Sequence, residues 1–258
     1  MDIHSNMAPR VLNGRLALVT GAGQGNGRAI ARGLANAGAR VIVTDINANT
    51  AQAVAEEIRA AGGEAWSFVL DVTSTEDCAA LAEKIGAEIG LLDLLVNNAG
   101  MLIREGVDSP RVTANLRRTL DVNVLGTFNP IRAWLPALRA TQGAIINVAS
   151  IAAYAGQPGI VGYSPSKGAV KLLTQSLAVE LGKDGVRVNA IAPGVIETPM
   201  TVATREAPEK LQRFLQRTPL SRVGQAEELV GPVVFLASDM ATYVNGVTLA
   251  VDGGFLAG

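Results

Sequence analysis

The feature that most constrains the fold is an alternation of short apolar runs with longer helical patterns along the chain. The apolar runs are residues 15–20, 40–45, 65–71, 91–100, 144–150 and 186–194. Helical patterns occupy residues 25–38, 49–61, 75–89, 111–138 and 164–182. The runs are almost continuously hydrophobic, which is typical of strands covered by helices on both faces. The sequence therefore predicts an α/β fold, a doubly wound parallel sheet whose ligand crevice lies beyond the carboxyl ends of its strands.

The same rhythm predicts one domain. No shift in composition divides residues 14–258, and residues 1–13 are expected to be an N-terminal extension. Residues 195–223 break the alternation, because they are rich in Thr, Pro and charged side chains with one amphipathic piece at 205–216. We interpret residues 195–223 as an insertion over the crevice, a substrate lid.

Composition excludes several classes of function. The single cysteine, Cys78, cannot form an internal disulfide, and with only one histidine, His4, no ligand set for zinc is expected. The 22 basic and 23 acidic residues leave a net charge of -1, which gives no basis for binding nucleic acid or an anionic membrane. Residues 140–166 carry no charge, but their glycines and Pro158 argue against a membrane span. The first ten residues lack the pattern of an export signal, so a cytoplasmic protein is expected.

A glycine-rich turn follows the first apolar run and opens the first helix. Its residues are Gly21, Gln24, Gly25, Asn26 and Gly27. Glycines there let backbone N–H groups approach a pyrophosphate, although such a turn can also be a simple strand-to-helix connection.

An acidic residue makes the nucleotide interpretation of this turn stronger. Asp45 ends the second run 18 residues after Gly27, as in a dinucleotide-binding fingerprint. Its carboxylate can accept both ribose hydroxyls of NAD, whereas the 2′-phosphate of NADP would be repelled by about 4 kcal/mol at ~4 Å and an effective dielectric of ~20. The sequence therefore predicts NAD as the cofactor.

Tyr163 and Lys167 form the candidate catalytic pair. They lie four residues apart at the start of a predicted helix, so both face the same side. A nearby ammonium and the helix N-terminus favour ionisation of a phenol whose reference pKa is about 10. An ionised tyrosine can exchange a proton with an alcohol or carbonyl oxygen. The same spacing also occurs on ordinary surface helices.

Taken together, these motifs resemble the short-chain dehydrogenase/reductase family, in its branch of about 250 residues, from Gly14 to Gly254. The match consists of Thr20-Gly21 with Gly25 and Gly27, Asp71-Val72, Asn97 to Gly100, Asn123, Ser150, Tyr163 with Lys167, and Pro193-Gly194. The resemblance implies a Rossmann-type domain with a parallel sheet of about seven strands. Two residues depart from the family pattern: Asn26 replaces an Ile or Leu, and Pro165 replaces a small residue.

The resemblance also implies roles for individual residues. The implied catalytic residues are Asn123, Ser150, Tyr163 and Lys167. The implied cofactor contacts beyond the glycine turn and Asp45 are Asp71, Val72, Asn98, Ala99, Gly100, Tyr163, Lys167, Pro193, Gly194, Val195, Ile196 and Thr198. For Asn123, the family pattern implies a kinked helix whose backbone oxygen holds a water leading to Lys167.

The implied reaction is metal-free hydride transfer between a secondary alcohol and the nicotinamide, with Tyr163 as the general acid or base. An uncharged or amphipathic alcohol or ketone is expected, because the expected pocket is mostly apolar. Its candidates are Met101, Leu102, Ala152, Tyr154, Gln157, Val195, Ile196 and Met200, with Arg104 and Arg205 as cations within reach.

Three alternatives stay open at this point. A β-ketoacyl-acyl-carrier-protein reductase is disfavoured by Gln24 and Asp45, since such enzymes generally use NADPH. A sugar or polyol dehydrogenase fits equally well, and a dinucleotide-sensing binding protein would not need Ser150, Tyr163 and Lys167 together. Family members are usually homotetramers that pair the helices near 111–138 and 164–182, which this chain is expected to do.

Overall fold

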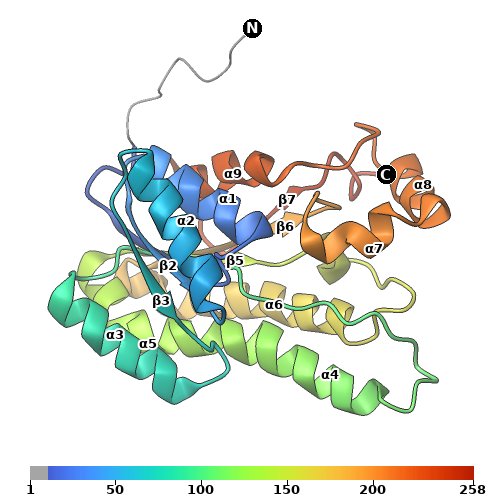
Figure 1. Cartoon of the computed structure of the whole chain (residues 1–258), viewed down its shortest axis with the longest axis horizontal. Coiled ribbons are helices and arrows are strands. Elements are labelled where there is room, and N and C mark those ends of the chain that lie inside the picture. Colours follow the sequence, from blue (N-terminus) through green and yellow to red (C-terminus); the bar gives the residue numbers. More distant parts are fainter. Residues whose placement is uncertain (1–10) are drawn as a thin grey trace, which may run out of the picture.

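The computed structural model describes residues 11–258, whose strands form one parallel sheet in the order β3-β2-β1-β4-β5-β6-β7 (Figure 1). The strands are β1 (Leu16–Val19), β2 (Arg40–Asp45), β3 (Ala65–Val69), β4 (Leu94–Asn97), β5 (Ala144–Val148), β6 (Arg187–Pro193) and β7 (Thr248–Val251). The predicted α/β fold with a parallel sheet of about seven strands is confirmed. Residues 1–10 of the predicted extension, with His4, lie outside the described residues.

Helices cover both faces of the sheet. One face carries α1 (Gly25–Asn36), α2 (Ala48–Ala60) and α9 (Val230–Ala237), and the other carries α3 (Thr75–Glu88), α5 (Gly126–Thr141) and α6 (Tyr163–Leu181) (Figure 1). In β1, Ala17 and Val19 pack in the first of these two cores and Leu16 and Leu18 in the second. Both faces of the strand are buried, which explains why the apolar runs show no polar alternation.

The sheet order reverses between β1 and β4, since the chain moves outward from β1 to β2 and β3 and then returns to β4. The connections leave these two strands in opposite directions, so their carboxyl ends open a crevice. The loops after β1, β2, β4, β5 and β6 meet at this edge.

Two predicted elements differ from expectation: one strand is shorter, and one helix is interrupted. The run at 91–100 gives only β4, because Asn98 leaves the strand to bind the glycine turn. Its backbone N–H donates to Thr20 Oγ1 (3.0 Å), and its side chain donates to the Gly21 carbonyl (2.9 Å). The single helix predicted at 111–138 is instead α4 (Val112–Leu120), a π-helical turn (Asp121–Leu125) and α5. Such turns hold one extra residue and often occur at functional sites.

The lid segment also differs from its prediction. The amphipathic piece expected at 205–216 is α8 (Pro208–Gln216), which begins three residues later than expected, and a short helix that was not predicted, α7 (Val202–Arg205), precedes it. Ala207 is extended between them, with φ of -104° and ψ of 96°, as expected for a residue that precedes proline. In contrast, α9 was not predicted at all. Its sequence VGPVVFLA is apolar on every side, so no amphipathic period marks it.

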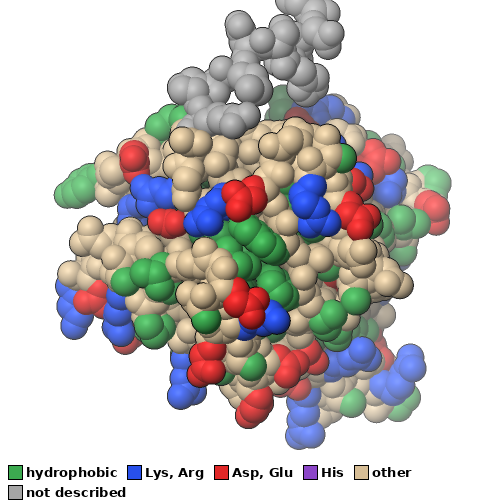
Figure 2. Space-filling model, turned by 60° about the vertical axis from the view of Figure 1, so that its left-hand side comes forward, with side chains coloured by type: hydrophobic (Ala, Val, Ile, Leu, Met, Phe, Trp, Pro, Cys, Tyr) green, Lys and Arg blue, Asp and Glu red, His purple; other side chains and the backbone are tan. Residues whose placement is uncertain are grey.

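Charged groups of both signs are interspersed over the face of the molecule in Figure 2. Within residues 11–258, no helix is both long and apolar enough to cross a bilayer. In the same range, no three His, Cys, Asp or Glu side chains are grouped so that they could hold a metal ion.

Candidate active site

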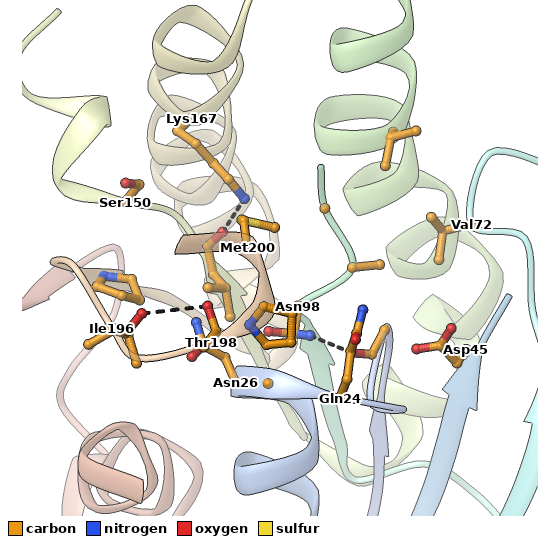
Figure 3. Close-up of a pocket in the computed structure, with 18 of the residues that line it drawn as sticks. Gln24, Asn26, Asp45, Val72, Asn98, Ser150, Lys167, Ile196, Thr198 and Met200 are labelled. Atoms are coloured by element: carbon orange, nitrogen blue, oxygen red, sulfur yellow. Dashed lines mark hydrogen bonds between the residues drawn. The ribbon is translucent and has the colours of Figure 1, made fainter. Parts of the chain in front are cut away.

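A cavity of about 340 Å³ opens at the carboxyl edge of the sheet. In Figure 3, Lys167 and Ser150 lie toward one end, Asp45 and Val72 lie toward the other, and Asn26 and Gln24 lie between them. The predicted residues that line the cavity are Gly21, Gln24, Gly25, Asn26, Asp45, Asp71, Val72, Asn98, Ala99, Gly100, Ser150, Tyr163, Lys167, Pro193, Gly194, Ile196 and Thr198. Three predicted residues, Gly27, Asn123 and Val195, do not line it.

The glycine turn has the shape of a phosphate cradle. Gly21 and Gly25 have φ values of +59° and +52°, a conformation that favours glycine. A Cβ on Gly27 would overlap the Gly21 carbonyl oxygen and the Asn98 amide nitrogen, so Gly27 allows α1 to pack tightly beneath the turn. The first turn of α1 has no acidic residue and no side-chain cap from Gln24. Its free N–H groups and partial positive charge therefore fit an anionic pyrophosphate.

Asp45 is held in place at the far end of the cavity. Its two carboxylate oxygens accept the backbone N–H groups of Gly23 (2.9 Å) and Asn47 (3.0 Å). Each oxygen keeps a further lone pair for a ribose hydroxyl. Among residues 11–258, the only basic residue that lines the cavity is Lys167, which lies at the opposite end from Asp45. The cavity wall near Asp45 therefore offers no cation to a 2′-phosphate.

The strand-end acid Asp71 closes a tight turn. Its Oδ1 accepts the backbone N–H of Thr73 (2.9 Å) and the Thr73 hydroxyl (2.7 Å), which leaves Val72 on the cavity wall. Ile46 lines the same end and is 70% exposed. The sequence reasoning missed Ile46, although a large apolar side chain directly after a strand-end acid was a usable signal.

At the other end, Lys167 is almost completely buried. Its Nζ donates to the Val148 carbonyl (2.7 Å) and lies 5.8 Å from the centre of the Tyr163 ring. Burial lowers the pKa of Lys167 to about 8, because the charged form loses hydration. Near neutral pH this lysine is therefore close to its titration point.

Tyr163 is half-buried, and the partial loss of hydration raises the pKa of its phenol. The nearby Ser150 hydroxyl and the positive charge of Arg104 act in the opposite direction, with smaller effect. The prediction that the surroundings of Tyr163 favour the phenolate is therefore wrong for these residues, because the lost hydration outweighs the neighbouring groups. The predicted proximity of Ser150 and Tyr163, by contrast, is present.

Asn123 lies in the π-helical turn, and its side chain links the loop after β4 to α6. Its Oδ1 accepts the backbone N–H of Met101 (2.8 Å), and its Nδ2 donates to the Met101 carbonyl (3.0 Å) and to Ser166 Oγ (2.9 Å). Its backbone oxygen accepts the Thr127 hydroxyl (2.8 Å). The predicted role of that backbone oxygen in leading a water to Lys167 stays a prediction.

The two departures from the family pattern have different surroundings. Asn26 lines the cavity, and its Oδ1 is buried without a hydrogen-bond partner. Pro165 lies in the first turn of α6, where its missing N–H breaks no helical bond.

Only two of the expected substrate contacts, Ile196 and Met200, line the main cavity. Ala152, Tyr154 and Gln157 line a separate hollow beside the start of α6. Arg205 pairs with Glu197 (3.2 Å). Of the expected apolar substrate contacts, those that line the main cavity therefore all come from the loop after β6.

Arg104 bridges the loop after β4 and the lid. Its Nη2 donates to Thr204 Oγ1 (2.6 Å) in α7, and its charge reaches Tyr163. Among the described residues, no carboxylate lies within ion-pair distance of Arg104.

Comparison with known proteins finds one family and several relatives that match nearly the whole chain. Residues 21–256 match a family described as enoyl-(acyl carrier protein) reductase. The cyclopentanol dehydrogenase of Comamonas testosteroni is 40% identical over 249 residues, covering 95% of this chain and 98% of that protein.

Two solved structures are similar over nearly the whole chain. One is a gluconate 5-dehydrogenase from Burkholderia cenocepacia in complex with NADP and tartrate, with a TM-score of 0.93 and 36% identity over 98% of this chain and 99% of that chain. The other is a 7α-hydroxysteroid dehydrogenase complexed with NADH and 7-oxo-glycochenodeoxycholic acid. It has a TM-score of 0.91 and 38% identity over 96% of this chain and 97% of that chain.

Proposed function

The chain belongs to the short-chain dehydrogenase/reductase family, NAD(P)-dependent oxidoreductases that act on alcohols, and we propose that it interconverts a secondary alcohol and a ketone with NAD. The observation that carries this proposal is the convergence of Ser150, Tyr163 and Lys167 at one end of a cavity whose other end holds Asp45. A binding protein without catalysis would not need a half-buried phenol and a buried lysine beside each other.

The proposed chemistry is a coupled transfer of a hydride and a proton. When bound, NAD supplies the carbon that accepts the hydride from the alcohol. Tyr163 takes the hydroxyl proton during oxidation and returns it during reduction. Ser150 donates a hydrogen bond to the same substrate oxygen, where negative charge develops. Lys167 would bind the ribose hydroxyls and stabilise the phenolate.

The preference for NAD over NADP rests on Asp45. Its carboxylate is fixed by two backbone N–H groups, and the only basic residue that the described part of the chain places on the cavity wall, Lys167, lies at the opposite end. A 2′-phosphate would meet uncompensated negative charge there.

Two substrate classes have support. The apolar side chains of Ile196 and Met200 on the cavity wall, and the relative that acts on cyclopentanol, favour an uncharged secondary alcohol. Arg104 favours a second candidate, an alcohol that also carries a carboxylate, because within residues 11–258 its guanidinium binds the Thr204 hydroxyl and no carboxylate, and its positive charge lowers the pKa of Tyr163. The solved relatives include a gluconate dehydrogenase, which is consistent with this class.

An assembly of four chains is also proposed. Apolar side chains on the outer faces of α5 and α6 are exposed: Phe128 (38%), Leu172 (62%) and Val179 (86%). Pairing of these helices between copies would cover them. Light scattering coupled to size exclusion should give the mass of a tetramer, and the mass of a monomer at assay concentration would contradict this assembly.

The function is tested by following NADH absorbance with a panel of cyclic alcohols, hydroxysteroids, polyols and hydroxy acids, each with NAD and with NADP. We expect turnover of at least one secondary alcohol and a higher kcat/KM with NAD. A failure of every substrate in both directions would contradict the enzymatic proposal, while a clear preference for NADP would contradict the role of Asp45.

Arg104→Met separates the two substrate classes. If a carboxylate binds Arg104, KM for hydroxy acids should rise roughly tenfold or more, as expected when a charged hydrogen bond is lost, while KM for uncharged alcohols stays within about threefold. Arg205→Met is the matched control, because its guanidinium already pairs with Glu197. An equal effect on both substrate classes would rule out a carboxylate partner for Arg104.

A further inference from the structure

Ser166 carries a buried hydroxyl that the proposed mechanism does not use. It lies on α6 between Tyr163 and Lys167 and is completely buried. A buried hydroxyl is unfavourable unless its hydrogen bonds are satisfied, so its partners indicate what it does.

Both of its partners belong to the active site. Ser166 Oγ accepts a hydrogen bond from Asn123 Nδ2 (2.9 Å) and donates one to the backbone carbonyl of Tyr163 (2.7 Å). Asn123 in turn accepts a hydrogen bond from the backbone N–H of Met101 and donates one to the Met101 carbonyl. A continuous series of hydrogen bonds therefore runs from the loop after β4, through the π-helical turn, to the peptide group of Tyr163.

Backbone hydrogen bonds also hold the first turn of α6, since the N–H groups of Tyr163 and Ser164 donate to the Ile160 carbonyl (3.0 and 3.3 Å). Gly162, the residue before the helix, provides no side-chain cap, and Pro165 has no N–H to donate. Gly162 lies tightly against α4, where an added Cβ would be 3.3 Å from Leu116 Cα. The position of Tyr163 therefore depends on these backbone hydrogen bonds, on the packing of Gly162 and on the Ser166 hydroxyl.

We propose that Ser166 is a positioning residue, whose hydroxyl joins Asn123 to the Tyr163 carbonyl and holds the phenol of Tyr163 against Ser150. This inference rests on the proposed function, because it assigns Ser166 to the placement of the proton-transferring group. Ser166 itself does not reach the cavity wall.

Thr174 is a matched control on the same helix. Its hydroxyl is also completely buried, accepts from an asparagine amide (Asn147 Nδ2, 2.9 Å) and donates to a helix carbonyl (Val170, 2.8 Å). Thr174 does not line the cavity and lies two turns beyond Lys167. Ser166→Ala and Thr174→Val therefore remove equivalent hydrogen bonds at different distances from the reaction.

The first experiment compares the pH profiles of alcohol oxidation. For Ser166→Ala we expect kcat to fall roughly tenfold, since small misplacements of reacting groups slow the chemical step, with KM for the dinucleotide changed less than about threefold. The Ser150 hydroxyl lowers the pKa of the Tyr163 phenol, and this effect should be weaker in the variant because the two groups lie farther apart. The pKa of the phenol should then be higher than in wild type, and the pH at which kcat rises should increase by about half a unit. Thr174→Val should keep the wild-type profile. A Ser166→Ala profile that superimposes on that of wild type and Thr174→Val would overturn the inference.

The second experiment does not depend on turnover. Ultraviolet difference titration of tyrosinate, with the Tyr163→Phe protein subtracted, reports the ionisation of Tyr163 alone. We expect the same upward shift in Ser166→Ala and none in Thr174→Val, and equal titrations would again overturn the inference. If Ser166→Ala does not fold, Ser166→Cys retains the volume and weakens the hydrogen bonds. Should the wild-type protein oxidise no alcohol, the proposed function fails while this titration still decides the role of Ser166.

Discussion

At the scale of single residues, the ionisation of the two central groups is set by burial. Burial raises the pKa of the Tyr163 phenol and lowers that of Lys167 to about 8, so both side chains are shifted toward their neutral forms. Lys167 still carries its charge for most of the time near neutral pH, and it loses that charge in the same alkaline range in which the phenol can ionise.

This ionisation predicts opposite pH dependences for the two directions of reaction. Oxidation requires the phenolate, which forms only above the raised pKa, so kcat for alcohol oxidation should increase with pH through the alkaline range. Ketone reduction requires the phenol and should decrease over the same range. Initial rates with saturating NAD or NADH check this, and parallel profiles for both directions would show that another group controls the rate.

Asp45 predicts cofactor choice. Asp45→Asn keeps a side-chain oxygen for one of the two backbone N–H groups but removes the charge that opposes a 2′-phosphate. The ratio of kcat/KM for NAD to that for NADP should fall about tenfold or more, which corresponds to roughly 1.4 kcal/mol. Asp71→Asn is the control, because Asp71 binds Thr73 and is expected near the adenine. An unchanged ratio in Asp45→Asn would remove Asp45 from cofactor selection.

At the scale of elements, the sequence predicted the strands, the glycine turn and the start of α6, because each has a local signal. The π-helical turn at Asp121–Leu125 leaves no mark in hydrophobic spacing, and only the family resemblance implied a kink at Asn123. The bond between Asn123 and Ser166 could not be predicted for the same reason. The break before Pro208, in contrast, was signalled by the proline.

Tight packing of α1 beneath the glycine turn predicts a contrast between two helical glycines. Gly27→Ala would place a methyl group onto Gly21 and Asn98, and should destabilise the protein by about 1–3 kcal/mol. Gly86→Ala in α3 meets nothing within 4 Å and should stabilise it by roughly 0.5–1 kcal/mol. Urea unfolding measures both, and a neutral Gly27→Ala would contradict the close packing of α1.

At the scale of the whole molecule, the reversal of strand order creates the crevice, and the residues of the site come from loops far apart in sequence. A ligand bound in such a crevice contacts residues from both halves of the sheet, so it binds only when the whole sheet is folded. Binding only to the folded state stabilises it by about 2.7 kcal/mol when the ligand is at 100 times its Kd.

Thermal unfolding should therefore report cofactor binding without catalysis. We expect NADH to raise Tm by about 5–10 °C at that saturation, and NADPH at the same concentration to raise it less. Equal shifts with the two dinucleotides would mean that Asp45 does not oppose the 2′-phosphate in this fold.

The most direct test of the central claim is the Tyr163→Phe protein, which loses only the phenolic oxygen. If that oxygen transfers the proton, turnover with the best alcohol should fall by roughly a thousandfold or more, while Kd for NADH, measured by fluorescence titration, stays within about threefold. A phenylalanine variant that retains most of the wild-type kcat would contradict the account, whichever substrate is used.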